Sequence, residues 1–163
     1  MKPAVFAAAV AIVFPYAALA ADKDLHGTWK LMSLSRKSAD GTVEEPRGKV
    51  PRGYLHLGPD GRMMSVIVNE KRPKPASVAK MTDQERVQLF NSMNAYAGTY
   101  KLAGNKITYT FDVVHNEVPE RAAVRDFKID GRRMTMVNEV AASTMDGTMA
   151  QTVTVWEKVV PPQ

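Results

Sequence analysis

Arg125 is the residue whose type and position most clearly suggest chemistry. It alternates with Phe127 and Ile129 in a strand-like run over 124–130, so a strand there places its guanidinium on the apolar face. An unpaired buried cation is costly and needs a carboxylate, backbone carbonyls or an anionic ligand. Two roles therefore stay open for Arg125: a structural ion pair, or a bidentate grip on a ligand carboxylate or phosphate.

Two histidines are the next candidates for chemistry. His115 falls on the same alternate positions as Tyr109 and Phe111, and His56 falls on those of Tyr54. Imidazole titrates near neutral pH, so two histidines beside a cavity could act as general acid and base. Each histidine could equally be a hydrogen-bonded or surface residue of a strand.

Several other kinds of site find no support in the sequence. No His-x-His or His-Glu-x-x-His spacing favours a metal site, and the chain has no cysteine that could bind zinc. The Gly-x-Ser-x-Gly elbow of serine hydrolases and the glycine-rich phosphate loops are missing as well. We therefore predict no metal site and no cofactor.

Methionine side chains are flexible and carry a polarisable sulfur atom. Met134 and Met136 lie two residues apart, so a strand directs both thioethers to the same side. In an exported protein such sulfurs could bind copper(I). We favour flexible core packing or a pliable ligand pocket, because methionine adapts to irregular space.

Short strands separated by turns are the elements that must position these residues. Asp-Gly pairs occur at 40–41, 60–61, 130–131 and 146–147, each between strand-like runs, and such pairs are typical of hairpin turns. Within 107–115 the hydrophobicity alternates with a period of two. The residues predicted to share one face there are Ile107, Tyr109, Phe111, Val113 and His115.

One helix is predicted after a proline-rich loop at 71–75. Residues 82–85 (Thr-Asp-Gln-Glu) form a capping box, in which two side chains satisfy backbone N–H groups of the first turn. Apolar residues then follow at spacings of three and four, at Val87, Phe90, Met93 and Ala97. Because these residues share one helical face, we expect the helix to pack against the sheet or to close one end of it.

These elements place the chain in the all-β class. An open sheet of this size would leave two exposed edges, and closure into a barrel removes them. We therefore predict an antiparallel up-and-down β-barrel of about eight to nine strands with one helix.

Six parts of the chain carry a family resemblance. They are residues 27–29 (Gly-Thr-Trp), 53–55, 59–63, 95–100 (Ala-Tyr-Ala-Gly-Thr-Tyr), 124–127 and Trp156. The first is similar to the Gly-x-Trp signature of lipocalins, and the whole set resembles the bacterial and fungal lipocalin-like domain family. The resemblance implies a calycin-type barrel with an internal cavity. It also implies small-molecule binding, with some relatives acting as isomerase-like or cyclase-like proteins in biosynthetic pathways.

The start of the chain has the features of a signal peptide. Lys2 gives a positive start, 4–18 is almost wholly apolar, and Ala-Leu-Ala at 18–20 matches an A-x-A cleavage site. We predict that residues 1–20 are a cleaved signal peptide and that 21–163 form the lipocalin-like barrel domain. Since no lipobox cysteine follows, we expect a periplasmic or secreted bacterial protein with no membrane span after cleavage.

Charge and composition limit the partners. The formal net charge is +5, but acidic and basic residues are mixed along most of the chain, and only 71–74 (Lys-Arg-Pro-Lys) is a local basic cluster. A basic stripe interleaved with aromatic residues is missing, so we expect no nucleic-acid partner. We expect a monomer, or a weakly associating protein, whose partner is a small hydrophobic or amphipathic ligand.

Three hypotheses for function follow, and we favour the first. It is an exported lipocalin-like protein that binds a small, largely apolar molecule in the barrel cavity. Its predicted ligand-binding residues are Arg125, His115, Tyr109, Phe111, Asn138, Tyr54, Met134 and Met136. The second is an isomerase, cyclase or hydro-lyase with His115, His56 and Arg125 as catalytic residues. The third is a structural or adaptor barrel with a filled core.

Overall fold

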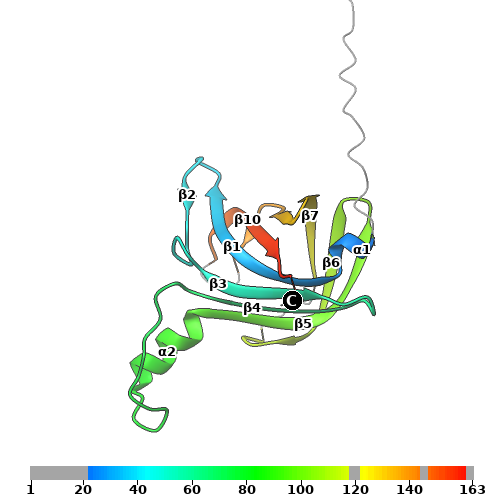
Figure 1. Cartoon of the computed structure of the whole chain (residues 1–163). Coiled ribbons are helices and arrows are strands. Elements are labelled where there is room, and N and C mark those ends of the chain that lie inside the picture. Colours follow the sequence, from blue (N-terminus) through cyan, green and yellow to red (C-terminus); the bar gives the residue numbers. More distant parts are fainter. Residues whose placement is uncertain (1–21, 118–121, 144–146, 161–163) are drawn as a thin grey trace, which may run out of the picture.

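The computed structural model describes residues 22–117, 122–143 and 147–160, and the predicted signal peptide lies outside them. Eight strands pair in chain order into one antiparallel sheet, and the first also pairs with the last, which closes a barrel (Figure 1). The barrel strands are β1 (Gly27–Ser38), β3 (Arg52–Leu57), β4 (Arg62–Val68), β5 (Met93–Ala103), β6 (Lys106–Val114), β7 (Ala122–Asp130), β8 (Arg133–Asn138) and β10 (Met149–Lys158). The predicted all-β class and up-and-down barrel are confirmed.

Four shorter elements accompany the barrel. The two-residue strands β2 (Val43–Glu44) and β9 (Ala141–Ala142) extend the sheet beside β1 and β10. The predicted helix is α2 (Asp83–Asn91), and a single turn, α1 (Asp22–Leu25), precedes the first strand.

Asp-Gly pairs form turns as predicted at 40–41, 60–61 and 130–131, while Asp146 of the fourth pair lies outside the described residues. The three glycines have φ angles of 88°, 76° and 57°, a backbone conformation that glycine adopts without strain. Asp40 also accepts a hydrogen bond from the Thr42 N–H at 2.9 Å, and this bond lowers the pKa of the Asp40 carboxyl. Local turn chemistry therefore fixes these hairpins.

Large side chains fill the end of the barrel beside α1. The Trp29 indole N–H donates to the Leu25 carbonyl at 2.8 Å, and the Lys158 ammonium lies 5.2 Å from the centre of the Trp29 ring. Almost completely buried side chains complete this core: Trp29, Trp156, Tyr109, Leu25, Leu31, Leu55, Leu57, Met63, Ile107, Met134 and Met136. Burial stabilises the fold by about 1.5–3 kcal/mol for each large apolar side chain, so this half of the interior is the main source of stability.

Two irregularities in strand pairing change which residues face inward. The pairing of β1 with β10 skips Met32, and after that bulge Leu34 and Arg36 face the interior. The pairing of β5 with β6 skips Asp112, and after that bulge Val114 faces the interior. Each bulge inserts one residue and so reverses the alternation of the strand beyond it.

The second bulge corrects the prediction that 107–115 forms one continuous face. Ile107 and Tyr109 are buried as expected, but Val113 is 60% exposed on the outer surface. His115 follows the strand and likewise does not line the barrel interior. The prediction was wrong beyond Phe111, because strict alternation cannot anticipate an inserted residue.

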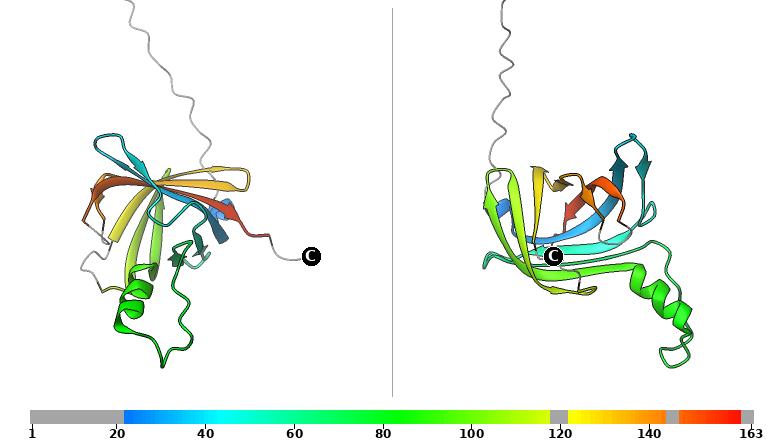
Figure 2. Two further views of the ribbon diagram at one scale, coloured as in Figure 1. Left: turned by 90° about the vertical axis from the view of Figure 1, so that its left-hand side faces the viewer. Right: turned by 180° about the vertical axis from the view of Figure 1, so that it is seen from behind.

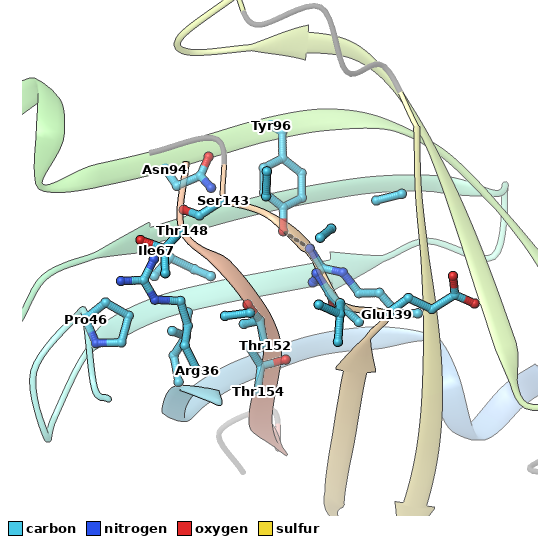
Figure 3. A pocket seen from close by; sticks show the side chains of 18 of the residues that line it. Arg36, Pro46, Ile67, Asn94, Tyr96, Glu139, Ser143, Thr148, Thr152 and Thr154 are labelled. Atoms are coloured by element: carbon cyan, nitrogen blue, oxygen red, sulfur yellow. Dashed lines mark hydrogen bonds between the residues drawn. The ribbon is translucent and has the colours of Figure 1, made fainter. Parts of the chain in front are cut away.

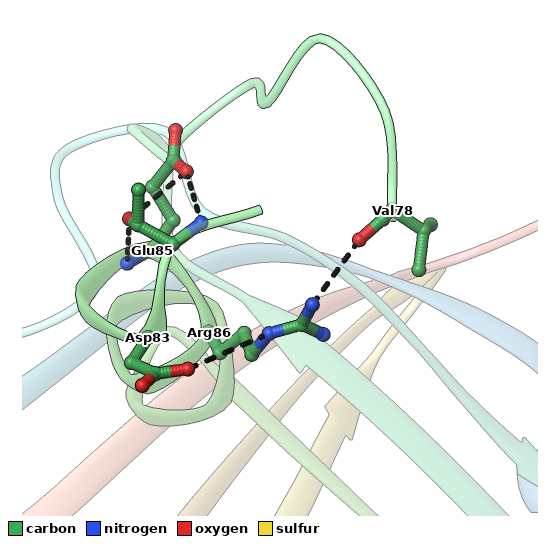
Figure 4. Close-up of polar contacts among 5 residues, drawn as sticks. Val78, Asp83, Glu85 and Arg86 are labelled. Atoms are coloured by element: carbon green, nitrogen blue, oxygen red, sulfur yellow. Dashed lines mark hydrogen bonds and ion pairs between the residues drawn. The ribbon is translucent and has the colours of Figure 1, made fainter. Parts of the chain in front are cut away.

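The predicted capping box is present at the start of α2. The Thr82 hydroxyl accepts from the Glu85 N–H at 3.2 Å, and the Glu85 carboxylate accepts from the Thr82 N–H at 2.8 Å (Figure 4). Arg86 donates to the Val78 carbonyl at 3.3 Å, which ties the helix to the loop before it. The first turn of α2 is therefore stabilised by local contacts alone.

The prediction that the helix packs against the sheet or closes one end of it was wrong. The helix projects away from the barrel and has no buried residue (Figures 1 and 2). It ends at Asn91, so Met93 and Ala97 belong to β5, and Val87 and Phe90 remain exposed. Only two of the four residues predicted to form the apolar face lie within the helix, which is too few to hold it against the sheet.

A substitution at Gly98 tests how crowded the bulge between β5 and β6 is. A Cβ atom there would lie 2.0 Å from the Thr110 carbonyl oxygen, so we expect Gly98→Ala to lower the free energy of unfolding by at least about 2 kcal/mol. Gly131→Asn is the control, since φ is +57° with open space around it, and should cost less than about 1 kcal/mol. Urea denaturation followed by tryptophan fluorescence measures both. Similar losses in the two variants would contradict the crowding at the bulge.

Candidate functional site

A cavity of about 740 Å³ occupies the end of the barrel away from α1. Its wall is built from the second half of β1, the loop before β3, the ends of β4, β6 and β8, and the beginnings of β5, β7 and β10. Ligand sites typically have volumes of about 300–1,000 Å³, so the space suits a small organic molecule. The third hypothesis, a barrel with a filled core, is not favoured.

The cavity wall combines apolar and charged side chains. Leu34, Ile67, Phe111 and Val114 contribute to the apolar part. The charged residues among the described lining are Arg36, Arg47, Arg125 and Glu139, so arginines outnumber carboxylates. Figure 3 shows Arg36 and Glu139 on opposite sides of the pocket, with Tyr96 between them.

Arg125 is part of the cavity wall. Its inward position on β7 agrees with the prediction made from the alternation of apolar residues. Its Nη2 atom donates to the Tyr96 hydroxyl at 3.3 Å (Figure 3), and its guanidinium carbon lies 5.3 Å from the centre of the Tyr109 ring. Within the described residues no carboxylate forms an ion pair with it, and its buried Nε has no hydrogen-bond partner. The predicted structural ion pair is therefore not found in the described part of the chain.

The charge of Arg125 persists in this setting. Burial lowers the pKa of its guanidinium, but Tyr96 and Tyr109 together raise it by more, so the pKa lies above its ordinary value. The group thus remains a cation at any physiological pH. Arg125 lines a cavity large enough for a ligand, and its buried Nε donor is unsatisfied.

Aromatic side chains form the surroundings of this cation. The Tyr96 and Phe111 ring centres lie 4.8 Å apart, and those of Tyr109 and Phe111 lie 6.1 Å apart. The fully buried Tyr109 hydroxyl donates to the Met136 sulfur at 3.6 Å. Burial raises the pKa of Tyr109, although the Arg125 charge opposes the shift. The hydroxyl therefore stays protonated and neutral.

Arg36 and Arg47 were not identified from the sequence. Arg36 is 9% exposed and pairs with Glu44 at 3.2 Å, while Arg47 is 3% exposed and donates to the Asn69 side-chain oxygen at 2.7 Å. Burial, and then the charge of Arg36, lower the pKa of Arg47 below its ordinary value. A signal for Arg36 was present, since the apolar residues before it fall at 29, 31, 32 and 34, and the adjacent pair at 31 and 32 interrupts the alternation where the bulge lies.

The structure brings only some of the predicted ligand-binding residues to the cavity. Arg125, Phe111 and Asn138 line it. Three others are fully buried in the core and are not part of the lining: Tyr109, Met134 and Met136. Ligand binding by the predicted residues remains a prediction. The three core residues could affect a ligand only through the side chains that line the cavity.

The remaining candidates lie outside the cavity, which corrects their expected placement. Tyr54 is 55% exposed on the outer face of β3. His56 is on the same face, with its Nδ1 3.2 Å from the Thr28 hydroxyl. The His115 ring packs against Phe90 of α2, with ring centres 4.8 Å apart. The histidines and Arg125 therefore do not converge, and the enzyme hypothesis is not favoured.

The described part of the chain has neither a metal-binding cluster nor a membrane-spanning helix. Those residues contain no group of three or more histidine, aspartate and glutamate side chains arranged to hold a metal ion. Their helices are also too short and too polar to cross a membrane.

The fold and the cavity together define a small antiparallel barrel with a ligand-sized interior. A family model described as a lipocalin-like domain matches residues 26–159. The chain therefore belongs to the lipocalin-like domain family, as the sequence resemblance predicted. Comparison with curated proteins finds no match.

Two solved structures are similar to the chain. One is a lipocalin-like protein from Bacteroides uniformis, with 14% sequence identity and a TM-score of 0.45, covering 83% of this chain and 99% of that one. The other is an uncharacterized protein from Bacteroides eggerthii, with 13% identity and a TM-score of 0.41, covering 82% and 98%.

Burial of Tyr109 predicts a loss of stability at alkaline pH. Because its pKa is raised by folding, the unfolded chain releases this proton first, and the free energy of unfolding should fall as pH rises above about 10. Tyr109→Phe should flatten this fall more than Tyr54→Phe, which removes an exposed phenol. Urea denaturation between about pH 8 and pH 11 measures the slopes. Equal slopes in both variants would show that Tyr109 does not titrate as a buried group.

Proposed function

We propose that the chain is an exported lipocalin-like protein that binds a small amphipathic acid. The acidic group pairs with Arg125, and the apolar part lies against the aliphatic and aromatic wall of the cavity. The observation that supports this most directly is the buried Arg125 guanidinium, which has one hydroxyl partner and no carboxylate partner among the described residues.

The energetics of Arg125 favour an anionic ligand over a neutral one. Leaving a buried charge without an anionic partner costs about 3–5 kcal/mol, and a neutral tyrosine hydroxyl and an aromatic ring supply no counter-ion. A carboxylate or phosphate accepts two parallel hydrogen bonds from a guanidinium and supplies the missing charge. Tyr96 restrains the guanidinium by accepting from Nη2, and the guanidinium keeps further N–H donors for a ligand.

Export is proposed on the strength of the first twenty residues alone. Their positive start, apolar run and A-x-A site are typical of a cleaved signal peptide. A periplasmic or extracellular location is compatible with a chain that has no cysteine, because such a chain has no thiol for an oxidising compartment to convert into a disulfide.

The anion-binding role of Arg125 can be tested with two probes of equal length, dodecanoate and dodecanol. Wild-type protein should bind dodecanoate more tightly, and Arg125→Met should weaken dodecanoate binding by about tenfold to a hundredfold with little effect on dodecanol. Arg62→Met is the matched control, since Arg62 pairs with Asp112 at 2.8 Å on the surface. Isothermal titration calorimetry gives the dissociation constants.

A stability measurement separates this role from a structural one. If Arg125 serves a ligand, Arg125→Met should unfold at the same or a higher temperature than the wild type, because methionine removes a poorly paired buried charge. Strong destabilisation together with unchanged dodecanoate binding would contradict the proposal.

The signal peptide is tested by expressing the whole chain in a bacterium and fractionating the cells. The periplasmic fraction should contain a protein whose mass matches 21–163, while Ala18→Asp should accumulate uncleaved precursor, because signal peptidase requires a small residue there. Ser35→Asp in the barrel is a control for the added charge. Retention of the full-length wild-type chain in the cytoplasm would disprove export.

A further inference from the structure

Three asparagine side chains line the cavity that Arg125 also lines. Asn94 comes from β5, Asn116 from the turn after β6, and Asn138 from the end of β8. None of these three amides makes a hydrogen bond within the described part of the chain, and the buried Asn116 Oδ1 has no partner. Thr154, by contrast, is occupied, since its hydroxyl accepts from the Trp156 indole N–H at 2.8 Å.

The pairing of the strands relates two of these amides to the cation, one directly and one through Tyr96. Asn138 is the direct cross-strand partner of Arg125, so their side chains leave neighbouring strands on the same inner face. Asn116 lies two residues beyond Val114, which pairs with Tyr96, the hydrogen-bond partner of Arg125. Asn138 therefore lies beside the guanidinium, and Asn116 adds a second amide to the same cavity, beyond the residue that pairs with Tyr96.

These amides favour an acid that carries a hydroxyl group over an acid with a purely apolar tail. In the empty cavity water can satisfy each carboxamide, which has two donors and one acceptor oxygen. A ligand with a purely apolar tail expels that water and leaves the amides unpaired, which weakens its binding. A hydroxyl group instead donates to an amide oxygen and accepts from an amide nitrogen, so it replaces the water. Sites built in this way discriminate strongly against analogues that lack the hydroxyl.

We propose that the ligand is a hydroxylated amphipathic acid, in which Arg125 binds the acidic group and the amides of Asn116 and Asn138 are the sites that bind hydroxyl groups. This inference rests on the proposed acid-binding function and specifies its ligand class. It replaces the largely apolar ligand expected from the sequence with a molecule that carries at least two polar groups.

The test compares dodecanoate with its hydroxy derivatives bearing the hydroxyl on the second, the third or the terminal carbon. Calorimetry on the wild-type protein should show at least one derivative binding about tenfold more tightly than dodecanoate. In the double variant Asn116→Leu with Asn138→Leu, the ratio of the two dissociation constants should fall to about one, since leucine has a similar volume and no polar atom.

Asn105→Ala is the matched control, because Asn105 lies in the turn between β5 and β6 at the other end of these strands and should keep the wild-type ratio. Circular dichroism verifies that each variant is folded. If dodecanoate binds but no hydroxy derivative binds more tightly to the wild type, the inference is overturned while the acid-binding function stands. If neither class of acid binds, the proposed function itself fails, and the inference fails with it.

Discussion

Pairing of β1 with β10 is the constraint on which the rest of the structure depends. The register runs from Trp29 opposite Lys158 to Ser38 opposite Ala150, and it joins the first and last strands of the barrel. Without this pairing the sheet would have two open edges and no interior. Closure gives every strand an inner and an outer face, so alternation along each strand decides whether a side chain serves the core, the cavity or the surface.

The interior created by closure is divided between stability and binding. Trp29 and Trp156 belong to the buried cluster at the end near α1, where packing is dense. The cavity lies at the other end, where bulges at Met32 and Asp112 change the inward residues. The packed end holds the strands in place, so the cavity end can carry polar side chains that a core would exclude.

Arg125 illustrates why the cavity end of the interior suits binding better than stability. Its charge is retained inside the barrel, with a phenol and an aromatic ring as its neighbours. A stability optimum would place an apolar residue there. The described residues give this buried arginine no carboxylate partner, and this observation supports the proposed acid ligand. The amides of Asn116 and Asn138 extend the same reasoning, since polar groups facing a cavity specify what can displace their water.

The sequence by itself determined the barrel class, the Asp-Gly hairpins, the capping box of α2 and the inward position of Arg125. These features follow from local turn chemistry and from a period of two, which neighbouring residues fix without distant contacts. Only the tertiary structure decided the outward position of His56, the position of His115 against Phe90, and the entry of Arg36 into the cavity. The physical reason is that bulges and closure depend on which strands pair, and one inserted residue reverses the face of all that follow it.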